Sequence, residues 1–315
     1  MCRRHTSRLL DASRWLGLLL LAILPAGALG FVSETRQQLT FLAAKQFNDC
    51  VAGTTIPRLT ALQVRNLVRG NLAEGEAGLT RRARRWQFYD RSNQDTPRVL
   101  WTIDTRLHKR FENVAQSVLD EEVDRDLARF EDLGVAIYYL QGVTVPANVV
   151  PIFHPRPWRW NSADTFVRYP LDREALLARL ENSCIELLAT PDTEGLDTLL
   201  DSTAAVTIAR IRAPIADMDA TWQVFWRESE PGEFGSYGPA GNNFGREAEF
   251  PCRAERCRLF EGDPIYTEFA LRQHRLAVVS TMRAMLILQR FRAARDPSLS
   301  RPGWDVSPLL PSSEG

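Results

Sequence analysis

Apolar residues recur every three or four positions along most of the chain, which is the spacing that places them on one face of an α-helix. This pattern predicts helices over residues 37–50, 58–72, 102–133 (with room for a break), 172–188 and 263–294. Another apolar element begins at 206–211, after a predicted connecting segment over 191–200. Because every predicted element is helical, we expect an all-α fold class.

Local signals mark where two of these helices begin. Asp172 and Asp263 are candidate N-caps, because an aspartate can accept hydrogen bonds from the free amide groups of a first helical turn. Pro264 suits the first helical position, where its missing N–H has no intrahelical partner to lose. The beginnings of the fourth and fifth helices are therefore predicted with a physical reason.

Two segments interrupt the helical pattern. The apolar run that begins at 136 stops at Gly142, turns through Pro146 and re-enters regular structure near Asn148. Residues 228–258 contain five glycines ahead of a close pair of cysteines. Such a composition predicts a long irregular insertion over the surface, of the kind that shapes a mouth or a partner contact.

The two ends of the chain differ from its helical middle. Within residues 1–30, four arginines precede the apolar run Trp15–Leu24, and small residues follow it, as in a cleaved secretory signal peptide. The run is too short to span a bilayer, so we expect a secreted or periplasmic protein without a transmembrane anchor. From Asp296 the composition turns to Pro, Ser and Gly, which predicts a disordered tail over 296–315 and leaves one domain over 31–295.

The formal net charge of the chain does not indicate a specialised class of protein. The 315 residues carry 39 basic and 39 acidic side chains, and removal of residues 1–30 takes away four arginines and one aspartate, so the formal net charge moves from 0 to −3. A protein specialised for nucleic acid usually carries a marked excess of basic residues. The balance therefore gives no strong nucleic-acid signature.

Four cysteines remain after the predicted cleavage, at positions 50, 184, 252 and 257. An even number in an exported chain permits two disulfides, and Cys252 with Cys257 could close a small loop. The remaining pair would be Cys50 with Cys184. A zinc site is disfavoured because no histidines lie at zinc-finger spacing from these cysteines.

The segment 136–151 holds Tyr139, Leu140, Gln141, Val143 and Pro146 in a spacing that resembles the central motif of the zinc-dependent phospholipase C and P1 nuclease superfamily. That motif reads His-Tyr-x-x-Asp-x-x-x-Pro-x-His, and its two histidines and its aspartate bind zinc. The three ligand positions hold Tyr138, Gly142 and Asn148 in this chain.

Three further segments fit the same family order. The family motif His-Phe-Tyr-Asp corresponds to 87–90, where Gln87 takes the place of the histidine. The expected mature chain starts at Phe31 and has Arg36 at its sixth position, where the family has a metal-binding histidine. In the window 161–169 the best-aligned ligand positions hold Ala163 and Val167. The readable resemblance covers about residues 31–170.

The resemblance implies a phospholipase C/P1 nuclease-like helical domain in which three zinc ions generate a hydroxide that attacks a phosphodiester. The positions that would hold those ions are substituted in this chain: Phe31, Arg36, Gln87, Tyr138, Gly142, Asn148, Ala163 and Val167. A guanidinium has no lone pair to offer a metal, and a glutamine amide is a poor zinc ligand. Metal-capable side chains in the same regions are Glu74, Glu76, Asp90, His154 and Asp164.

These substitutions lead to three hypotheses. The first is an exported pseudoenzyme that has lost its zinc cofactor, has no catalytic residue, and binds or scaffolds an unidentified partner, such as a phospholipid or a phosphorylated ligand held by Arg36 and nearby aromatic residues. The alternative is an active metal-dependent phosphodiesterase, of phospholipase C or nuclease type, with a reduced metal site. A third is an enzyme of unrelated mechanism on the same scaffold, for which the sequence shows no Ser/His/Asp or Cys/His arrangement. His108 and His274 are expected to be ordinary helix residues.

Overall fold

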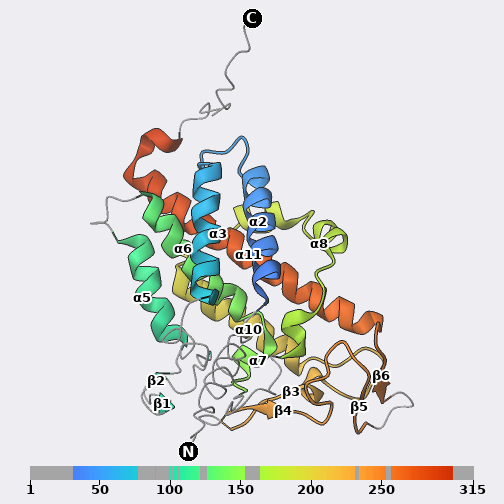
Figure 1. Ribbon diagram of the computed structural model, residues 1–315. Coiled ribbons are helices and arrows are strands. Elements are labelled where there is room, and N and C mark those ends of the chain that lie inside the picture. The colour runs from blue at the N-terminus through green and yellow to red at the C-terminus, as the bar shows by residue number, and fades with distance from the viewer. Residues whose placement is uncertain are drawn as a thin grey trace, which may run out of the picture.

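A long C-terminal helix, α11 (Pro264–Arg295), runs diagonally through the computed structural model and contacts most of the other helices (Figure 1). The structure describes residues 31–76, 89, 99–100, 103–104, 107–120, 126–152, 164–230, 234–252 and 257–300. Helices α2 (Ser33–Cys50) and α3 (Ala61–Glu76) lie side by side, and α6 (Asp126–Gly142) packs against both and against α11. The mainly helical architecture confirms the expected all-α class.

The remaining α-helices of the described residues are α5, α7, α8, α9 and α10, which span Leu107–Leu119, Pro146–Val149, Arg173–Arg179, Ser183–Leu188 and Leu196–Arg212. Short 3-10 helices span Thr165–Arg168 (η4), Trp222–Val224 (η5) and Pro297–Ser300 (η6). The described strands form three two-stranded antiparallel sheets: β1 (Val99–Leu100) with β2 (Ile103–Asp104), β3 (Trp226–Arg227) with β4 (Ser236–Tyr237), and β5 (Ala248–Glu249) with β6 (Arg258–Leu259).

Both predicted N-caps are confirmed. The Asp172 carboxylate accepts a hydrogen bond from the Ala175 amide at the start of α8, and the Asp263 carboxylate accepts one from the Ile265 amide at the start of α11. Pro264 occupies the first turn of α11, as expected. Each cap supplies an acceptor to an amide that has no partner inside its helix, which fixes where the helix begins.

Several predicted boundaries are wrong. The helix predicted over 58–72 begins later, at Ala61, and continues to Glu76 as α3. The stretch 102–133 is broken, as the prediction allowed, into α5 and α6, but it begins with strand β2 and α6 continues beyond it to Gly142. The helix predicted over 172–188 is divided into α8 and α9, and the element expected from 206 is the second half of α10, which already begins at Leu196. The predicted tail begins with η6.

Two glycines explain how closely α3 and α6 approach each other. A methyl group at Gly70 would collide with the backbone carbonyl of Glu131, and one at Gly134 would collide with that of Leu67. Because these are backbone atoms, neither helix could yield without moving as a whole. The two glycines therefore set the distance between the helices that carry Glu74 and Tyr138.

An aromatic cluster joins η4, β3, the loop between β4 and β5, and the first half of α11. Phe166, Trp226, Phe244 and Phe269 lie within 5.2–6.0 Å of one another, measured between ring centroids, and all four are buried. Phe244 belongs to the segment predicted to be a surface insertion over 228–258. That prediction is wrong for this part, because the segment contributes side chains to the core as well as strands β4 and β5.

Two disulfides link the described chain, and both pairings were expected. Cys50 at the end of α2 is bonded to Cys184 in α9, across 134 residues of sequence, and Cys252 is bonded to Cys257. Within the described residues, no helix combines the length and the apolar character needed to cross a membrane. The predicted signal peptide over 1–30 and the end of the predicted tail, 301–315, lie outside the described residues.

Candidate functional site

The predicted mature N-terminus lies against the window that was aligned with the last metal ligands. The amide of Val32 donates a hydrogen bond to the carbonyl of Val167 over 3.3 Å. The Phe31 ring is fully buried, with its centroid 5.8 Å from that of Phe166 and 5.1 Å from that of His274. Phe31 therefore lies beside η4, because the next residue, Val32, is hydrogen-bonded to Val167, and the side chains of Phe31 and Val167 are both apolar.

One turn into α2, Arg36 reaches into the interior between α3 and α6. Its side chain is only 1% exposed, and its guanidinium carbon lies 4.7 Å from the ring centroid of Tyr138. A Cβ atom at Gly75 would lie 2.5 Å from one guanidinium nitrogen, so the absence of a side chain there makes room for the cation. The structure thus brings Arg36, Tyr138 and Gly75 together, and it does not present the Arg36 guanidinium to solvent.

Glu74 precedes this glycine and is already engaged by protein groups. The phenol of Tyr139 donates a 2.6 Å hydrogen bond to the Glu74 carboxylate, and the guanidinium of Arg110 forms an ion pair with it at 3.8 Å. Burial, together with the neighbouring Glu74 carboxylate, raises the pKa of the Tyr139 phenol, so this phenol stays protonated as a donor. Of the two glutamates proposed as residual ligands, Glu74 is a structural acceptor, and the side chain of Glu76 lies outside what the structure describes.

Gly142 and Asn148 meet at the turn that follows α6. The Asn148 side-chain amide donates a 2.8 Å hydrogen bond to the Gly142 carbonyl, which closes the predicted turn through Pro146. A Cβ atom added at Gly142 would lie 3.8 Å from the Asn148 amide nitrogen, so a side chain at 142 would point toward residue 148. Tyr138 and Gly142 are separated by one helical turn and therefore share a face of α6.

Tyr89 belongs to the segment 87–90, which was aligned with the family motif His-Phe-Tyr-Asp, and it connects that segment to this turn. Its backbone amide donates a 3.0 Å hydrogen bond to the carbonyl of Asn148, and its phenol donates one of 2.7 Å to Asp201 in α10. Within the segment 87–90, Tyr89 is the residue that the structure describes, whereas Gln87 and Asp90 lie outside the described residues. This segment and the central motif over 136–151 are thus adjacent at Tyr89 and Asn148.

Asp164 was the metal-capable residue of the window 161–169, but its carboxylate already accepts three hydrogen bonds from neutral donors. One oxygen accepts from the Phe166 amide at 2.9 Å, and the other accepts from the Trp226 indole at 2.8 Å and from the Tyr237 phenol at 3.0 Å. Complete burial raises the pKa of the Asp164 carboxyl, and these hydrogen bonds oppose the shift. Asp164 caps η4 and holds β3 and β4 against it.

Gln141 has a role that the sequence did not reveal. The side chain is fully buried, donates to the hydroxyl of Thr40 at 3.0 Å and accepts from the amide of Asn71 at 3.2 Å. A longer contact of 3.5 Å reaches Thr281 in α11. A glutamine inside an apolar helical run was the available signal, because a buried amide needs partners from other elements. Gln141 joins α6 to α2, α3 and α11.

The remaining predicted site residues lie outside the described part of the chain: Ala163 and His154, in addition to Gln87 and Asp90. In the part that is described, His108 and His274 are buried members of α5 and α11, as expected, and no group of three or more His, Cys, Asp or Glu side chains is arranged to hold a metal ion. Comparisons with protein-family models, with curated proteins and with solved structures each gave no match.

Proposed function

We propose that this protein is an exported, phospholipase C/P1 nuclease-like helical protein that has lost its trinuclear zinc site and acts as a non-catalytic binding or scaffold protein. Segments that lie in the family order along the chain also contact one another: residue 32 with 167, residue 36 with 138, residue 142 with 148, and residue 148 with 89. This set of contacts is what a shared ancestral metal site would leave behind.

The observation that carries the proposal is the buried Arg36 guanidinium over the ring of Tyr138. Two positions that would supply imidazole ligands instead hold a permanent cation and an aromatic face, which attract each other through the ring quadrupole. A buried positive charge also repels a divalent cation at short range. The attraction between the Arg36 guanidinium and the Tyr138 ring therefore stabilises this part of the protein without a metal.

The other described positions fit zinc no better. Zinc sites in proteins use imidazole, thiolate or carboxylate donors, whereas Phe31 and Val167 are hydrocarbons, Gly142 has no side chain, and the Asn148 amide is bonded to a backbone carbonyl. The nearby carboxylates of Glu74 and Asp164 are engaged by phenol, indole and amide donors. The described residues therefore do not form a set of zinc ligands that could support hydrolysis by a metal-bound hydroxide.

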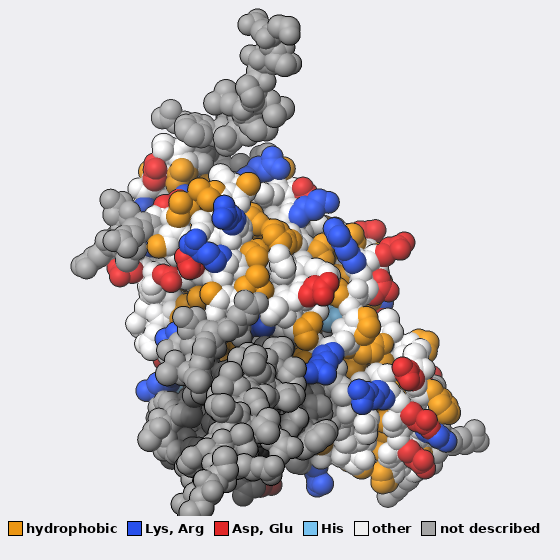
Figure 2. Space-filling model, viewed as in Figure 1, with side chains coloured by type: hydrophobic (Ala, Val, Ile, Leu, Met, Phe, Trp, Pro, Cys, Tyr) orange, Lys and Arg blue, Asp and Glu red, His pale blue; other side chains and the backbone are white. Residues whose placement is uncertain are grey.

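Export is supported by the two disulfides, because such bonds persist in oxidising compartments. The face in Figure 2 mixes basic and acidic side chains. Many of the described charges are paired, as in Arg275 with Glu186 at 2.7 Å and Arg179 with Glu268 at 2.8 Å. Such a surface suits an exported protein with a specific partner better than one that binds polyanions through bulk charge.

The proposal is tested by measuring the metal content of the purified mature protein and its hydrolysis of bis(p-nitrophenyl) phosphate. We expect no stoichiometric zinc after dialysis and no chelator-sensitive hydrolysis. Stoichiometric zinc with hydrolysis that chelation abolishes would instead establish the reduced-site phosphodiesterase.

A gain-of-binding variant tests the family assignment separately. The substitutions R36H, Q87H, Y138H, G142D and N148H restore the family ligand types, and Gly142 has space for the first side-chain atom. We expect this variant to bind zinc, because imidazole and carboxylate donors would then share one region. A matched control, R36Q/Y138Q, introduces amides at two of the same positions and should not bind zinc. If the variant with all five substitutions folds but binds no zinc, the assignment to this superfamily is wrong.

A further inference from the structure

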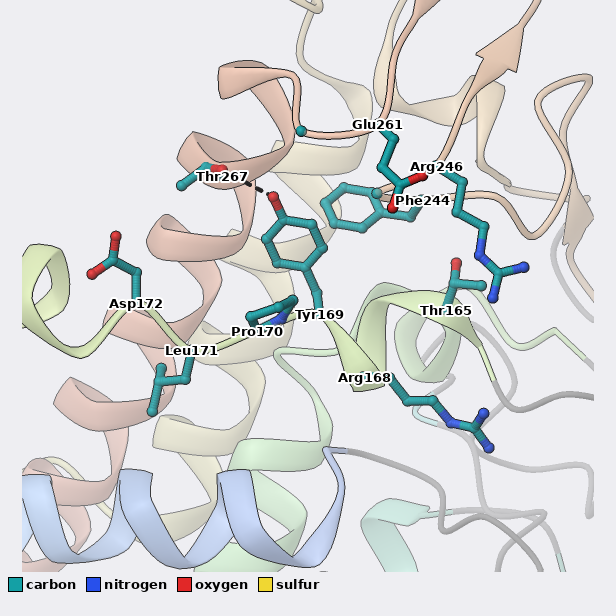
Figure 3. Close-up of a pocket in the computed structure, with 12 residues that line it drawn as sticks. Thr165, Arg168, Tyr169, Pro170, Leu171, Asp172, Phe244, Arg246, Glu261 and Thr267 are labelled. Carbon is teal, nitrogen blue, oxygen red and sulfur yellow. Dashed lines mark hydrogen bonds between the residues drawn. The ribbon is translucent and has the colours of Figure 1, made fainter.

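A pocket of about 550 Å³ lies between the segment that joins η4 to α8, the loop around Phe244 and the start of α11 (Figure 3). None of the predicted site residues lines it. Its volume falls in the range of ligand sites for small molecules, which is roughly 300–1,000 Å³. The pocket therefore has the dimensions of a binding site and can be considered independently of the proposed loss of zinc.

Two aromatic rings form the apolar wall of this pocket. The rings of Tyr169 and Phe244 meet edge to face, with their centroids 5.2 Å apart, and the Tyr169 hydroxyl is hydrogen-bonded to the hydroxyl of Thr267 over 2.9 Å. Gly245 has a φ of +79°, and a Cβ atom there would lie 2.7 Å from a ring carbon of Tyr169. Glycine at this position thus lets the loop close against the ring, and the hydrogen bond fixes the ring in place.

Charge is distributed unevenly around the two rings. Figure 3 shows the side chains of Arg168 and Arg246 on one side of the pocket and Asp172 on the opposite side. Asp172 is committed to the cap of α8. Both arginines are exposed, and neither guanidinium forms an ion pair or a hydrogen bond with another described residue. By contrast, Arg179 and Arg272 both pair with Glu268.

From this arrangement we propose that the pocket binds a small organic anion with a flat apolar body. The body would lie against the partly exposed ring of Tyr169, which the buried ring of Phe244 supports, and the anionic group would pair with the guanidinium groups of Arg168 and Arg246. Planar guanidinium groups match the geometry of phosphate and carboxylate oxygens, and they also tolerate a neighbouring aromatic surface. Glu261, on the rim, weakens the positive potential, which favours a ligand with a single anionic group over a polyanion.

Isothermal titration of the full mature protein with phenyl phosphate tests this proposal, with inorganic phosphate and phenol as the two partial ligands. We expect saturable binding of phenyl phosphate in roughly the millimolar range, as suits a ligand of this size. Each partial ligand should bind at least about tenfold more weakly, since each lacks the contacts of the other half. No saturable binding of phenyl phosphate, or equal binding of inorganic phosphate, would overturn the proposal.

Charge variants locate the binding. R168Q/R246Q should weaken phenyl phosphate binding roughly tenfold or more, R168K/R246K should retain part of it, and E261Q should strengthen it, because these changes alter the potential beside the ring wall. The matched control, R58Q/R65Q, removes two other exposed arginines that do not line the pocket. All positions are on the surface, so melting temperatures should agree. Equal weakening in the control, or no effect of R168Q/R246Q, would show that the anion does not bind here.

Discussion

At the scale of single residues, most polar side chains inside this protein have a specific partner. Asp164 accepts three hydrogen bonds, and Gln141 connects three other helices. His274 is different, because its Nε2 atom is buried with no hydrogen-bond partner in the described structure, and its ring lies against Phe31 and Phe166. A charged imidazole would be poorly solvated among these rings, so the folded state holds His274 neutral.

This environment predicts a loss of stability in acid. Burial lowers the pKa of His274 to about 4, whereas an unfolded histidine titrates near 6.5. Between these values the unfolded chain binds the extra proton, so the free energy of unfolding falls as the pH drops from about 6.5 to about 4, by about 3 kcal/mol. Urea unfolding across this range should show a smaller loss for H274L than for the natural protein. Parallel pH curves for the two would contradict the assignment of this loss to His274.

At the scale of helices, the sequence predicted starts better than ends. Aspartate caps and Pro264 are local signals, so the starts of α8 and α11 were predictable, as was the stop at Gly142. The end of α3 was not predicted, because Gly75 lies beyond the helix expected over 58–72. The glycines of α3 have tertiary roles: Gly70 admits the backbone of α6, and Gly75 admits the Arg36 guanidinium. Similarly, the connecting segment predicted over 191–200 contains Gly195, the N-cap of α10, and the first turn of that helix.

The close contact of α3 with α6 gives a direct test. G134A would place a methyl group on the backbone carbonyl of Leu67, and the two helices would have to separate, at a cost of about 3 kcal/mol in the free energy of unfolding. G142A lies on the same helix, where the nearest atom would be 3.8 Å away, so it should change stability by less than about 1 kcal/mol. Denaturant unfolding of both variants measures this difference. Equal effects would mean that helix propensity, and not the close approach, governs both sites.

At the scale of the whole molecule, the helical class and both disulfide pairings could be predicted from sequence. The residues that form the candidate site could be predicted only in part. The substituted positions were found from motif spacing, and the contacts of Arg36 with Tyr138 and of Gly142 with Asn148 followed from the structure. The pocket beside Tyr169 and Phe244 was not predicted. Its lining comes from three separate segments, and none of them carries a motif that links it to the others.

The two disulfides should differ in what they contribute to stability. Cys50–Cys184 spans 134 residues and Cys252–Cys257 spans 5, so the entropy of the unfolded chain is restricted far more by the first. Loop-closure entropy predicts that C50A/C184A lowers the free energy of unfolding by about 5 kcal/mol and C252A/C257A by about 2 kcal/mol. Urea titrations under oxidising conditions compare the two variants. A larger effect for the short loop would contradict this reasoning.

The bond between Cys50 and Cys184 also determines how the protein responds to proteolysis. A cut at any peptide bond between these residues would produce two fragments that still migrate as one species on a non-reducing gel and separate once a thiol is added. Helix α2, which carries Arg36 and borders the candidate site, would remain attached to the larger fragment after such a cut. Detachment of α2 from the rest of the protein therefore requires both a protease and a reductant.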